Sequence, residues 1–437
     1  MNRKTFLARG LSGLLYPLAA GALSSNALAK ASPVTVPVDE NGWIRIRKMF
    51  SLRNDMIHMS AMLLASHPEP VREAIAFYNH KLDTENASYL VKVNRANQNA
   101  ARKAAAGYLN VNPDDIALTE STTIGLGIVY RGLQLKKGDE IIVASGDYYS
   151  TYQAIHLTTQ ATGAKMVEVD IYSGSLNAEK NQIIKKITSA ITPMTRVIAL
   201  TWVHSGTGLK LPMKELGHAL RQVNALRSED DRFIVCVDGV HAFGVENFTM
   251  SDLGCDLFIS GCHKWLFGPR GTGIVWGNQR AWKKLVPVIP SFLEEDAWKN
   301  WREKKDFAFT TAALISPGGF KSFENLWALP EAFKFHQQIG KASVASRTHA
   351  LADKLKKGLL EMEHVILHTP RNPELSSGII CFDVKRKTPH QVVEHLEKKM
   401  IIASVTPYSG RHARLTPCIY NSPAEVSMVL KEINNLR

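Results

Sequence analysis

The sequence Ser260-Gly-Cys-His-Lys-Trp-Leu-Phe-Gly-Pro-Arg-Gly-Thr-Gly273 places one lysine, Lys264, between an apolar run and a glycine-rich turn. A second apolar run ending in an aspartate, Phe233-Ile-Val-Cys-Val-Asp-Gly239, comes before it, so that Asp238 precedes Lys264 by 26 residues. Continuous apolar runs of this length are typical of strands buried on both faces of a parallel sheet. Because ligands bind at the carboxyl ends of such strands, we expect Asp238 and Lys264 to meet in one site.

Similar apolar runs alternate with helix-length segments from about residue 61 onward. One helix is expected to begin at Glu69 and a second to cover 95–108. Later helices are expected at 178–191 and 213–224. Helical segments between parallel strands cover both faces of a sheet, which predicts an α/β fold. The expected strands are 115–119, 140–144, 164–169, 195–200 and 233–237.

The pattern changes after Thr311. The turn-rich Ser316-Pro-Gly-Gly319 resembles a hinge, and the residues from 324 to 357 form a largely helical stretch. Apolar runs at 378–384 and 401–405 flank a helix at 390–399, which predicts a smaller α+β domain. We therefore divide the chain into a large domain at 61–315 and a small C-terminal domain at 316–437, with 30–60 packing against the small domain.

The first 29 residues have the composition of an export signal. Basic residues Arg3 and Lys4 precede a short apolar run, and Ala27-Leu-Ala29 suits cleavage. Asn2-Arg-Lys-Thr-Phe-Leu7 is similar to a twin-arginine signal with lysine in place of the second arginine. The run is too short for a stable membrane span. We expect export to the periplasm; an N-terminal anchor, an uncleaved disordered tail and a cytoplasmic location are the alternatives.

The overall composition is that of a soluble globular protein. The 437 residues are 45% hydrophobic and 21% charged, and the net charge is +13. No basic block is interleaved with aromatic residues, so nucleic-acid binding is not favoured. Five cysteines without a CxxC pair suggest buried thiols. The fifteen histidines show no HExxH-type spacing, so no metal site is predicted.

Lys264 and Asp238 suit a pyridine aldehyde cofactor. A lysine set among apolar residues has a lowered pKa, and its free amine can form a Schiff base with an aldehyde. A buried carboxylate needs a cationic partner, which a protonated pyridine nitrogen supplies. A solvated surface lysine and an aspartate capping the next helix are the alternatives. His241 can orient Asp238 or contact the cofactor's phenolic oxygen, or it can be a packed structural histidine.

Other residues suit the rest of such a site. Hydroxyls and amides at a helix start can bind a phosphate, and a lone N-cap is the alternative. Gly125-Leu-Gly127 lacks the third glycine of a dinucleotide fingerprint, which disfavours NAD. An arginine fork can bind a substrate carboxylate. The residues in question are Ser121, Thr122 and Thr123, with Ser260 and His263 as further phosphate donors, Tyr148 or Tyr149 to stack on a ring, and Arg414 for the carboxylate.

The order of these motifs resembles the class-V aminotransferases of fold type I, which depend on pyridoxal 5′-phosphate, and especially their isopenicillin-N-epimerase-like branch. The resemblance runs from about Ser60 to the C-terminus. It rests on Leu118-Thr-Glu-Ser-Thr-Thr123, Tyr149, Ser205-Gly-Thr-Gly208, Asp238-Gly-Val-His241, Cys262-His-Lys-Trp-Leu266 and Arg414 through Asn421.

The resemblance implies a role for each matching residue. Lys264 would be the aldimine lysine and Asp238 the partner of the pyridine nitrogen. Tyr149 would lie near the cofactor ring, and Arg414 would bind the substrate carboxylate. His241 or Ser205 would lie near the phenolic oxygen, and the phosphate group would contact Thr122, Thr123, Ser260 and His263. The family's sheet has seven strands, and its members are usually homodimers, in which Gly318 and Gly319 would belong to a loop contributed by the neighbouring subunit.

The reaction is less constrained than the cofactor. Transamination is the prediction, with epimerisation, lyase or decarboxylating chemistry as alternatives. A cysteine desulfurase is disfavoured because Cys381 has strand-like surroundings and Cys418 lies inside the arginine motif. A non-catalytic binding protein and a NAD-dependent oxidoreductase are the readings from other classes. Exported members of the family include an enzyme of pyoverdine maturation, so the resemblance extends to an amino acid within a secreted peptide as substrate.

Overall fold

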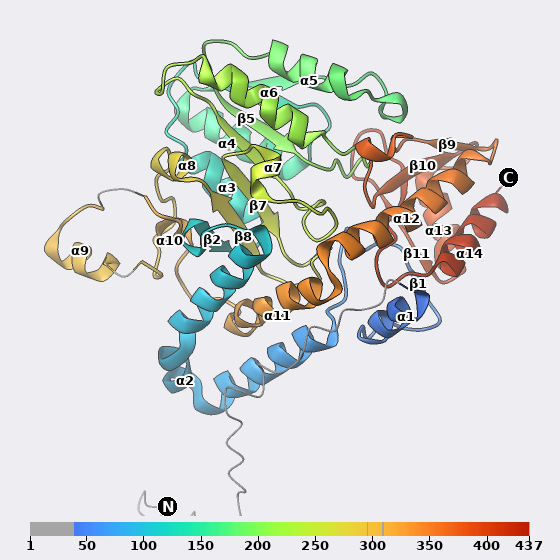
Figure 1. Cartoon of the computed structure of the whole chain (residues 1–437), viewed down its shortest axis with the longest axis horizontal. Coiled ribbons are helices and arrows are strands. Elements are labelled where there is room, and N and C mark those ends of the chain that lie inside the picture. Colours follow the sequence, from blue (N-terminus) through green and yellow to red (C-terminus); the bar gives the residue numbers. More distant parts are fainter. Residues whose placement is uncertain (1–38, 295, 308–309, 437) are drawn as a thin grey trace, which may run out of the picture. The chain divides into compact units, whose positions relative to one another are not determined.

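A computed structural model describes residues 39–294, 296–307 and 310–436 (Figure 1). The expected export signal at 1–29 lies outside the described residues. The described part belongs to one compact unit. It contains a seven-stranded sheet and a four-stranded sheet, together with a separate pair of short strands.

The seven-stranded sheet is mostly parallel, which confirms the predicted α/β class. Its strands are β2 (Ile116–Thr119), β3 (Glu140–Ala144), β4 (Lys165–Val169), β5 (Thr195–Thr201), β6 (Ile234–Asp238), β7 (Leu257–Gly261) and β8 (Gly273–Gly277). Their order is β2-β8-β7-β6-β5-β3-β4, and β8 is antiparallel to both of its neighbours. The link from β7 to β8 is too short for a crossover helix, so the chain must return antiparallel. This short link contains Lys264.

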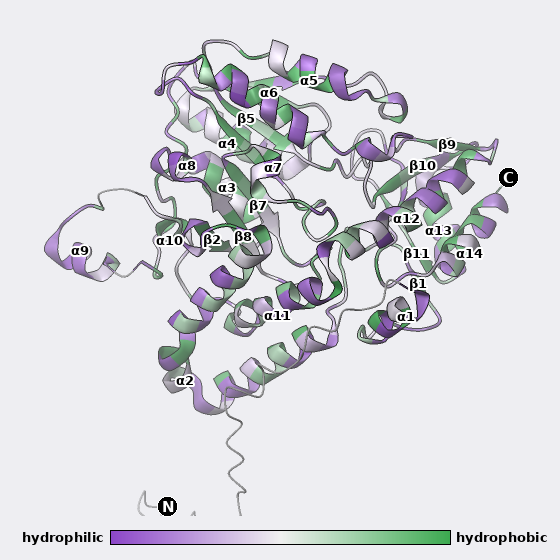
Figure 2. Ribbon diagram, viewed as in Figure 1, coloured by the Kyte–Doolittle hydropathy of each residue, from purple (hydrophilic) through white to green (hydrophobic). Residues whose placement is uncertain are grey.

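Apolar side chains project from both faces of this sheet. In β3, Ile142 joins one hydrophobic cluster, whereas Ile141 and Val143 join the other. Figure 2 shows the hydrophobic strands and the polar outer faces of the covering helices. These helices are α3 (Thr122–Gly132), α4 (Tyr149–Thr162), α5 (Lys180–Ser189), α6 (Met213–Ala225), α7 (Met250–Leu253) and α8 (Gln279–Lys283).

The two helices expected near Glu69 and at 95–108 form one long run, α2 (Glu69–Leu109). Asn86 has the non-helical angles φ 50° and ψ −132°, and this kink divides the run into two helical segments, in agreement with the two expected helices. Helix α11 (Phe323–Ile339) packs along α2 (Figure 1). Gly340, with φ +91°, separates α11 from α12 (Lys341–Leu360), so the expected helical stretch is two helices.

The four-stranded sheet has the order β12-β13-β10-β9 and is antiparallel throughout. Its strands are β9 (Val365–Leu367), β10 (Ile380–Val384), β12 (Ser404–Val405) and β13 (Ala413–Leu415). The apolar side chains of this region form their own cluster with α12, α13 (Pro389–Lys398) and α14 (Pro423–Asn434). The N-terminal strand β1 (Ile57–His58) pairs in parallel with β11 (Ile401–Ile402), so the run at 401–405 is two strands in different sheets.

The remaining elements are short. Helix α1 (Glu40–Lys48) is joined to α12 by an ion pair of 2.8 Å between Glu40 Oε2 and Arg347 Nη1. Helices α9 (Ala297–Glu303) and α10 (Ala312–Ile315) follow β8, and single 3-10 turns are η1 (Pro113–Asp115), η2 (Ser175–Asn177) and η3 (Pro373–Leu375). Within the described ranges, the helices are all too short or too polar to span a bilayer.

Candidate active site

Lys264 lies in the tight turn that joins β7 to β8. The turn is anchored by the next three side chains, Trp265 to Phe267, of which each is 1% exposed. Gly244 lets the turn approach closely, because a Cβ at that position would lie 2.6 Å from the backbone nitrogen of Leu266. Lys264 Nζ consequently has a defined neighbour and lies 3.4 Å from His241 Nε2.

The amine of Lys264 is tuned toward its neutral form. Burial lowers its pKa from 10.5 to about 8, since a charged amine is poorly solvated there. Asp238 opposes this shift and the positive charge of Arg414 adds to it. An amine near neutral pH can act as a nucleophile toward a carbonyl or as a base.

Asp238 ends β6 and is 3% exposed. Burial raises the pKa of its carboxyl to about 6, whereas the N–H of Val240 and the charge of Lys264 lower it. Val240 N donates to Asp238 Oδ1 at 3.0 Å. Within the described ranges, no ion pair joins Asp238 to a cation. The site therefore holds a buried carboxylate that a cationic ring could neutralise.

His241 is buried and electrically neutral. Burial, followed by the charges of Lys264, Arg414 and His263, lowers its pKa well below 6.5. Its Nδ1 is buried without a hydrogen-bond partner among the described residues. The free nitrogen of a neutral imidazole can accept a hydrogen bond from a bound group or, in the other tautomer, donate one to it.

The start of α3 forms the opposite side of the site. Ser121 caps this helix, its Oγ accepting from Ile124 N at 3.2 Å. Thr122 Oγ1 accepts from Gly261 N at 2.7 Å, which ties the helix start to the end of β7. The first turn of a helix leaves backbone N–H groups without helical partners, and its dipole favours an anion. Both hydroxyls accept these bonds and keep their own O–H, so the hydroxyls as well as the free amides of this helix start can donate to a phosphate.

Arg414 brings a buried positive charge from β13 in the second sheet. Its side chain is held by Ser205 O, which accepts from Nη1 at 2.8 Å, and by Ser404 Oγ, which accepts from Nε at 3.1 Å. The residue is 3% exposed, and no acidic side chain of the described chain forms an ion pair with it. A buried guanidinium with unused N–H groups is suited to a carboxylate ligand.

One cavity collects most of the residues expected from the sequence. Its lining also includes Met62 and Leu63 from the segment before α2. The expected residues that line it are Ser121, Thr122, Thr123, Ser205, Asp238, His241, His263, Lys264 and Arg414. Burial lowers the pKa of His263 to about 4, so this imidazole is also neutral.

Several expected residues lie elsewhere. Tyr149 is 70% exposed and Tyr148 lines the cavity in its place. Ser260 is fully buried behind the cavity, where its Oγ donates to Gly261 O at 2.9 Å. Gly318 and Gly319 were expected to reach the site of a neighbouring subunit, so their position outside this chain's cavity lining leaves that expectation a prediction; Gly318 N donates to Pro290 O at 2.8 Å.

Tyr408, which the sequence did not reveal, supports the site from outside the cavity lining, to which its neighbour Pro407 belongs. It lies in the loop between β12 and β13, and its Oη is 2.6 Å from Ser205 Oγ. A Cβ on Gly206 would lie 2.9 Å from the Tyr408 ring, so the glycine permits this contact. The glycine in Ser205-Gly-Thr-Gly208 was the available signal for a close approach, but it does not identify the partner.

Asp147 and His204 form a second buried pair that was not anticipated. Asp147 Oδ1 lies 3.4 Å from His204 Nε2, and their side chains are 0% and 1% exposed. Burial raises the pKa of Asp147 well above its ordinary value and lowers that of His204 to about 4. Burial therefore favours the neutral form of both groups.

A lysine, a buried carboxylate, a helix start and an arginine around one cavity define an enzyme that handles amines and anionic groups. The chain matches the family model for class-V aminotransferases over residues 65–428. It therefore belongs to the class-V aminotransferase family.

Known relatives carry out more than one reaction. A probable cysteine desulfurase of Treponema pallidum is 26% identical, covering 88% of this chain and 95% of that protein. An isopenicillin N epimerase of Streptomyces clavuligerus is 23% identical, covering 78% and 84%.

Solved structures show the same fold. A C-DES mutant with glycine covalently linked to the PLP cofactor superposes with a TM-score of 0.79 at 20% identity, covering 89% of this chain and 99% of that chain. A cysteine desulfurase from Thermococcus onnurineus gives a TM-score of 0.76 at 21% identity, covering 90% and 97%. These neighbours confirm a fold-type-I architecture.

Proposed function

We propose that this pyridoxal-phosphate-dependent enzyme transfers the amino group of an amino acid to a keto acid. The observation that carries the proposal is the position of Lys264. Its amine, with a pKa of about 8, lies 3.4 Å from a neutral imidazole in a cavity that also holds a buried carboxylate and a buried arginine.

The described residues fit the cofactor. Asp238, buried without an ion pair in the described chain, would hold the pyridine nitrogen, and the start of α3 at Thr122 and Thr123 would hold the phosphate. His241, with its free Nδ1, would face the phenolic oxygen. Lys264 would hold the aldehyde. When bound, pyridoxal phosphate supplies an electron-accepting ring that stabilises negative charge at the substrate α-carbon.

Arg414 and Lys264 have separate roles: Arg414 binds the substrate and Lys264 moves a proton. Arg414 fixes the substrate carboxylate and so determines which α-carbon bond faces the reactive centre. Lys264 Nζ takes the α-proton, because a lowered pKa leaves a usable fraction of neutral amine at pH 7. Lys264 would then carry that proton and could return it, while the bound cofactor would supply the electron-accepting ring that permits the exchange.

The cysteines disfavour a desulfurase. Such a reaction needs a thiol that can reach the substrate sulfur. All five cysteines are buried, and the cavity lining in the described chain contains none of them. Burial raises the pKa of Cys381 and of Cys418 to about 12, so neither is a thiolate at neutral pH.

The experiment is a half-reaction without added acceptor. Holoenzyme is mixed with single amino acids carrying deuterium at the α-carbon, and the products are identified by mass spectrometry and chiral chromatography. Transamination gives one keto acid per cofactor and converts the cofactor to its amine form. Racemised amino acid with solvent hydrogen and no keto acid would instead show epimerisation, and released sulfur from cysteine would show desulfuration; either result overturns the proposal.

We further propose that the enzyme is exported and works as a homodimer. Residues 1–29 support export by their composition. Exposed aromatic side chains support a subunit interface, because Trp301 is 72% and Phe320 is 88% exposed. Cell fractionation with mass measurement of the mature N-terminus tests the first proposal. Light scattering of the purified enzyme tests the second, and a monomeric mass would contradict it.

A further inference from the structure

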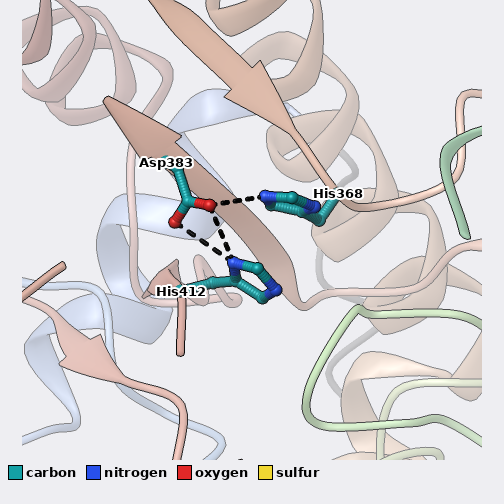
Figure 3. Close-up of side chains that lie close together, drawn as sticks. All are labelled: His368, Asp383 and His412. Carbon is teal, nitrogen blue, oxygen red and sulfur yellow. Dashed lines mark hydrogen bonds and ion pairs between the residues drawn. The ribbon is translucent and has the colours of Figure 1, made fainter. Parts of the chain in front are cut away.

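Three polar side chains converge on the four-stranded sheet, away from the cavity lining. They are His368, Asp383 and His412 (Figure 3). His368 directly follows β9, Asp383 is in β10, and His412 directly precedes β13. No metal site was predicted from the sequence, because the histidines lack the short HExxH-type spacing. Asp383 is 15 residues from His368 and 29 residues from His412.

The antiparallel register explains why they meet. Phe382 pairs with Leu367 on one side and with Ala413 on the other, so Asp383 lies opposite His412. His368 N donates to Cys381 O at 2.9 Å, which continues the ladder by one residue. Residues opposite one another, or two apart along a strand, share a face of a sheet. The three side chains therefore project from the same face.

Their polar atoms point at one another. His368 Nε2 lies 2.7 Å from Asp383 Oδ2, and His412 Nδ1 lies 3.0 Å from the same oxygen. The two imidazole rings are stacked, with centroids 3.7 Å apart. One ligand atom from each residue lies within 4.8 Å of the other two. Two nitrogens and one carboxylate oxygen are consequently directed at a common volume.

The surroundings suit a cation with water in its remaining positions. The side chains of His368, Asp383 and His412 are 26%, 28% and 17% exposed, so the cluster is neither sealed nor fully solvated. Burial alone would raise the pKa of Asp383, but hydrogen bonds from the two histidines outweigh it and lower that pKa to about 2. The cluster thus contains a carboxylate anion at neutral pH.

We propose that His368, Asp383 and His412 bind a divalent late first-row metal ion such as Zn²⁺. Imidazole and carboxylate are the ligands that such ions prefer, at about 2.0–2.2 Å. Ligand atoms around a tetrahedral ion stand somewhat farther apart than 2.7–3.0 Å, so the two nitrogen–oxygen separations would lengthen by a few tenths of an ångström, and the stacked imidazole rings would tilt so that both nitrogens face the ion. Each imidazole would bind through the nitrogen that now faces Asp383 and carry its proton on the other nitrogen.

The ion would join the cluster to the substrate side of the enzyme. His412 directly precedes β13, the strand that contains Arg414. The loop that ends at His412 contains Tyr408, which contacts Ser205. A metal bridge between the ends of β9 and β13 would therefore fix the base of the loop that lines the cavity. The inference itself does not depend on the reaction that the enzyme catalyses.

The test is direct metal binding by the holoenzyme without an affinity tag. Zn²⁺ is titrated by calorimetry, with Mg²⁺ as the hard-cation comparison, into the wild type, Asp383→Asn and His412→Gln. We expect one Zn²⁺ per chain, no comparable Mg²⁺ binding, and a Kd weakened by about 100-fold or more in each variant, since even outer-shell changes commonly cost 10–100-fold in metal affinity. Cu²⁺ added in place of Zn²⁺ should show nitrogen hyperfine coupling in its EPR spectrum.

The matched control is His395→Gln. His395 lies 3.6 Å from Glu432 and is similarly exposed, but it forms a pair with one acid and no second histidine. This variant should bind Zn²⁺ as the wild type does. Circular dichroism and cofactor absorbance establish that each variant is folded. Zn²⁺ binding that is absent from the wild type, or equally strong in folded Asp383→Asn, would overturn the proposal.

Discussion

Replacing Lys264 by methionine should stabilise the cofactor-free protein. A lysine whose pKa is about 8 when folded and 10.5 when unfolded disfavours the folded state, because the fold resists the charged form. The penalty is fully present below pH 8 and disappears as the pH rises through 10.5. At 1.36 kcal/mol for each pKa unit, it amounts to about 3 kcal/mol at pH 7 and about 2 kcal/mol at pH 9. The folded pKa of about 8 already includes the attraction of Lys264 to Asp238, so that attraction is not subtracted a second time.

The assay is denaturant unfolding of the apo-proteins between pH 7 and pH 10.5. Lys210→Met is the matched control, since Lys210 Nζ lies 2.9 Å from Glu246 Oε2 in a partly buried ion pair. Loss of that partner should lower the free energy of unfolding, whereas Lys264→Met should raise it by a margin that shrinks with increasing pH. A Lys264→Met protein that is no more stable than wild type, or a pH-independent margin, would refute the reasoning about the buried amine.

Three further predictions concern the substrate, the cofactor and the scaffold. Arg414→Met should raise the KM for amino acids by about 100-fold or more, from the loss of charge-assisted hydrogen bonds, and leave cofactor affinity unchanged; equal losses for amines without a carboxylate would contradict it. Uptake of pyridoxal phosphate by the apo-enzyme should rise about fivefold from pH 7 to pH 8, as Lys264 loses its proton near pH 8, whereas a rate still climbing steeply above pH 9 would indicate an ordinary lysine. Asn86→Gly should preserve or raise the melting temperature and Asn86→Ala should lower it, because φ is 50° in the bend of α2; the reverse order would contradict the account of the bend.

The sequence predicted the sheet better than the site's periphery. Buried strands such as Ile234–Asp238 can be recognised in the sequence as continuous apolar runs, because both faces of the sheet are covered. Two helices were expected before β2, and the structure has two helical segments there, but the sequence did not locate the kink at Asn86 that divides them. Element type was therefore easier to predict than element boundaries.

Site residues could be predicted where the chemistry of the side chain was enough. They were missed where the prediction needed the neighbours of the residue in the folded chain. Lys264, Asp238 and Arg414 stand out because charged groups in apolar surroundings need partners. Tyr148 and Tyr149 are adjacent, and only the start of α4 decides which one faces the cavity. Tyr408 lies 203 residues from its partner Ser205, so no local pattern could reveal the contact. The members of the histidine–aspartate cluster are 15 and 29 residues apart and meet only through strand register, so no local pattern revealed them either.

The central claim is that Lys264 holds pyridoxal phosphate. The most direct measurement is borohydride reduction of the purified, cofactor-loaded protein, followed by digestion and peptide mass spectrometry. The account predicts a pyridoxyl group on the peptide that contains Lys264 and none in the folded Lys264→Ala variant. Protein that takes up no pyridoxal phosphate, or a pyridoxyl group fixed on other lysines alone, would contradict it.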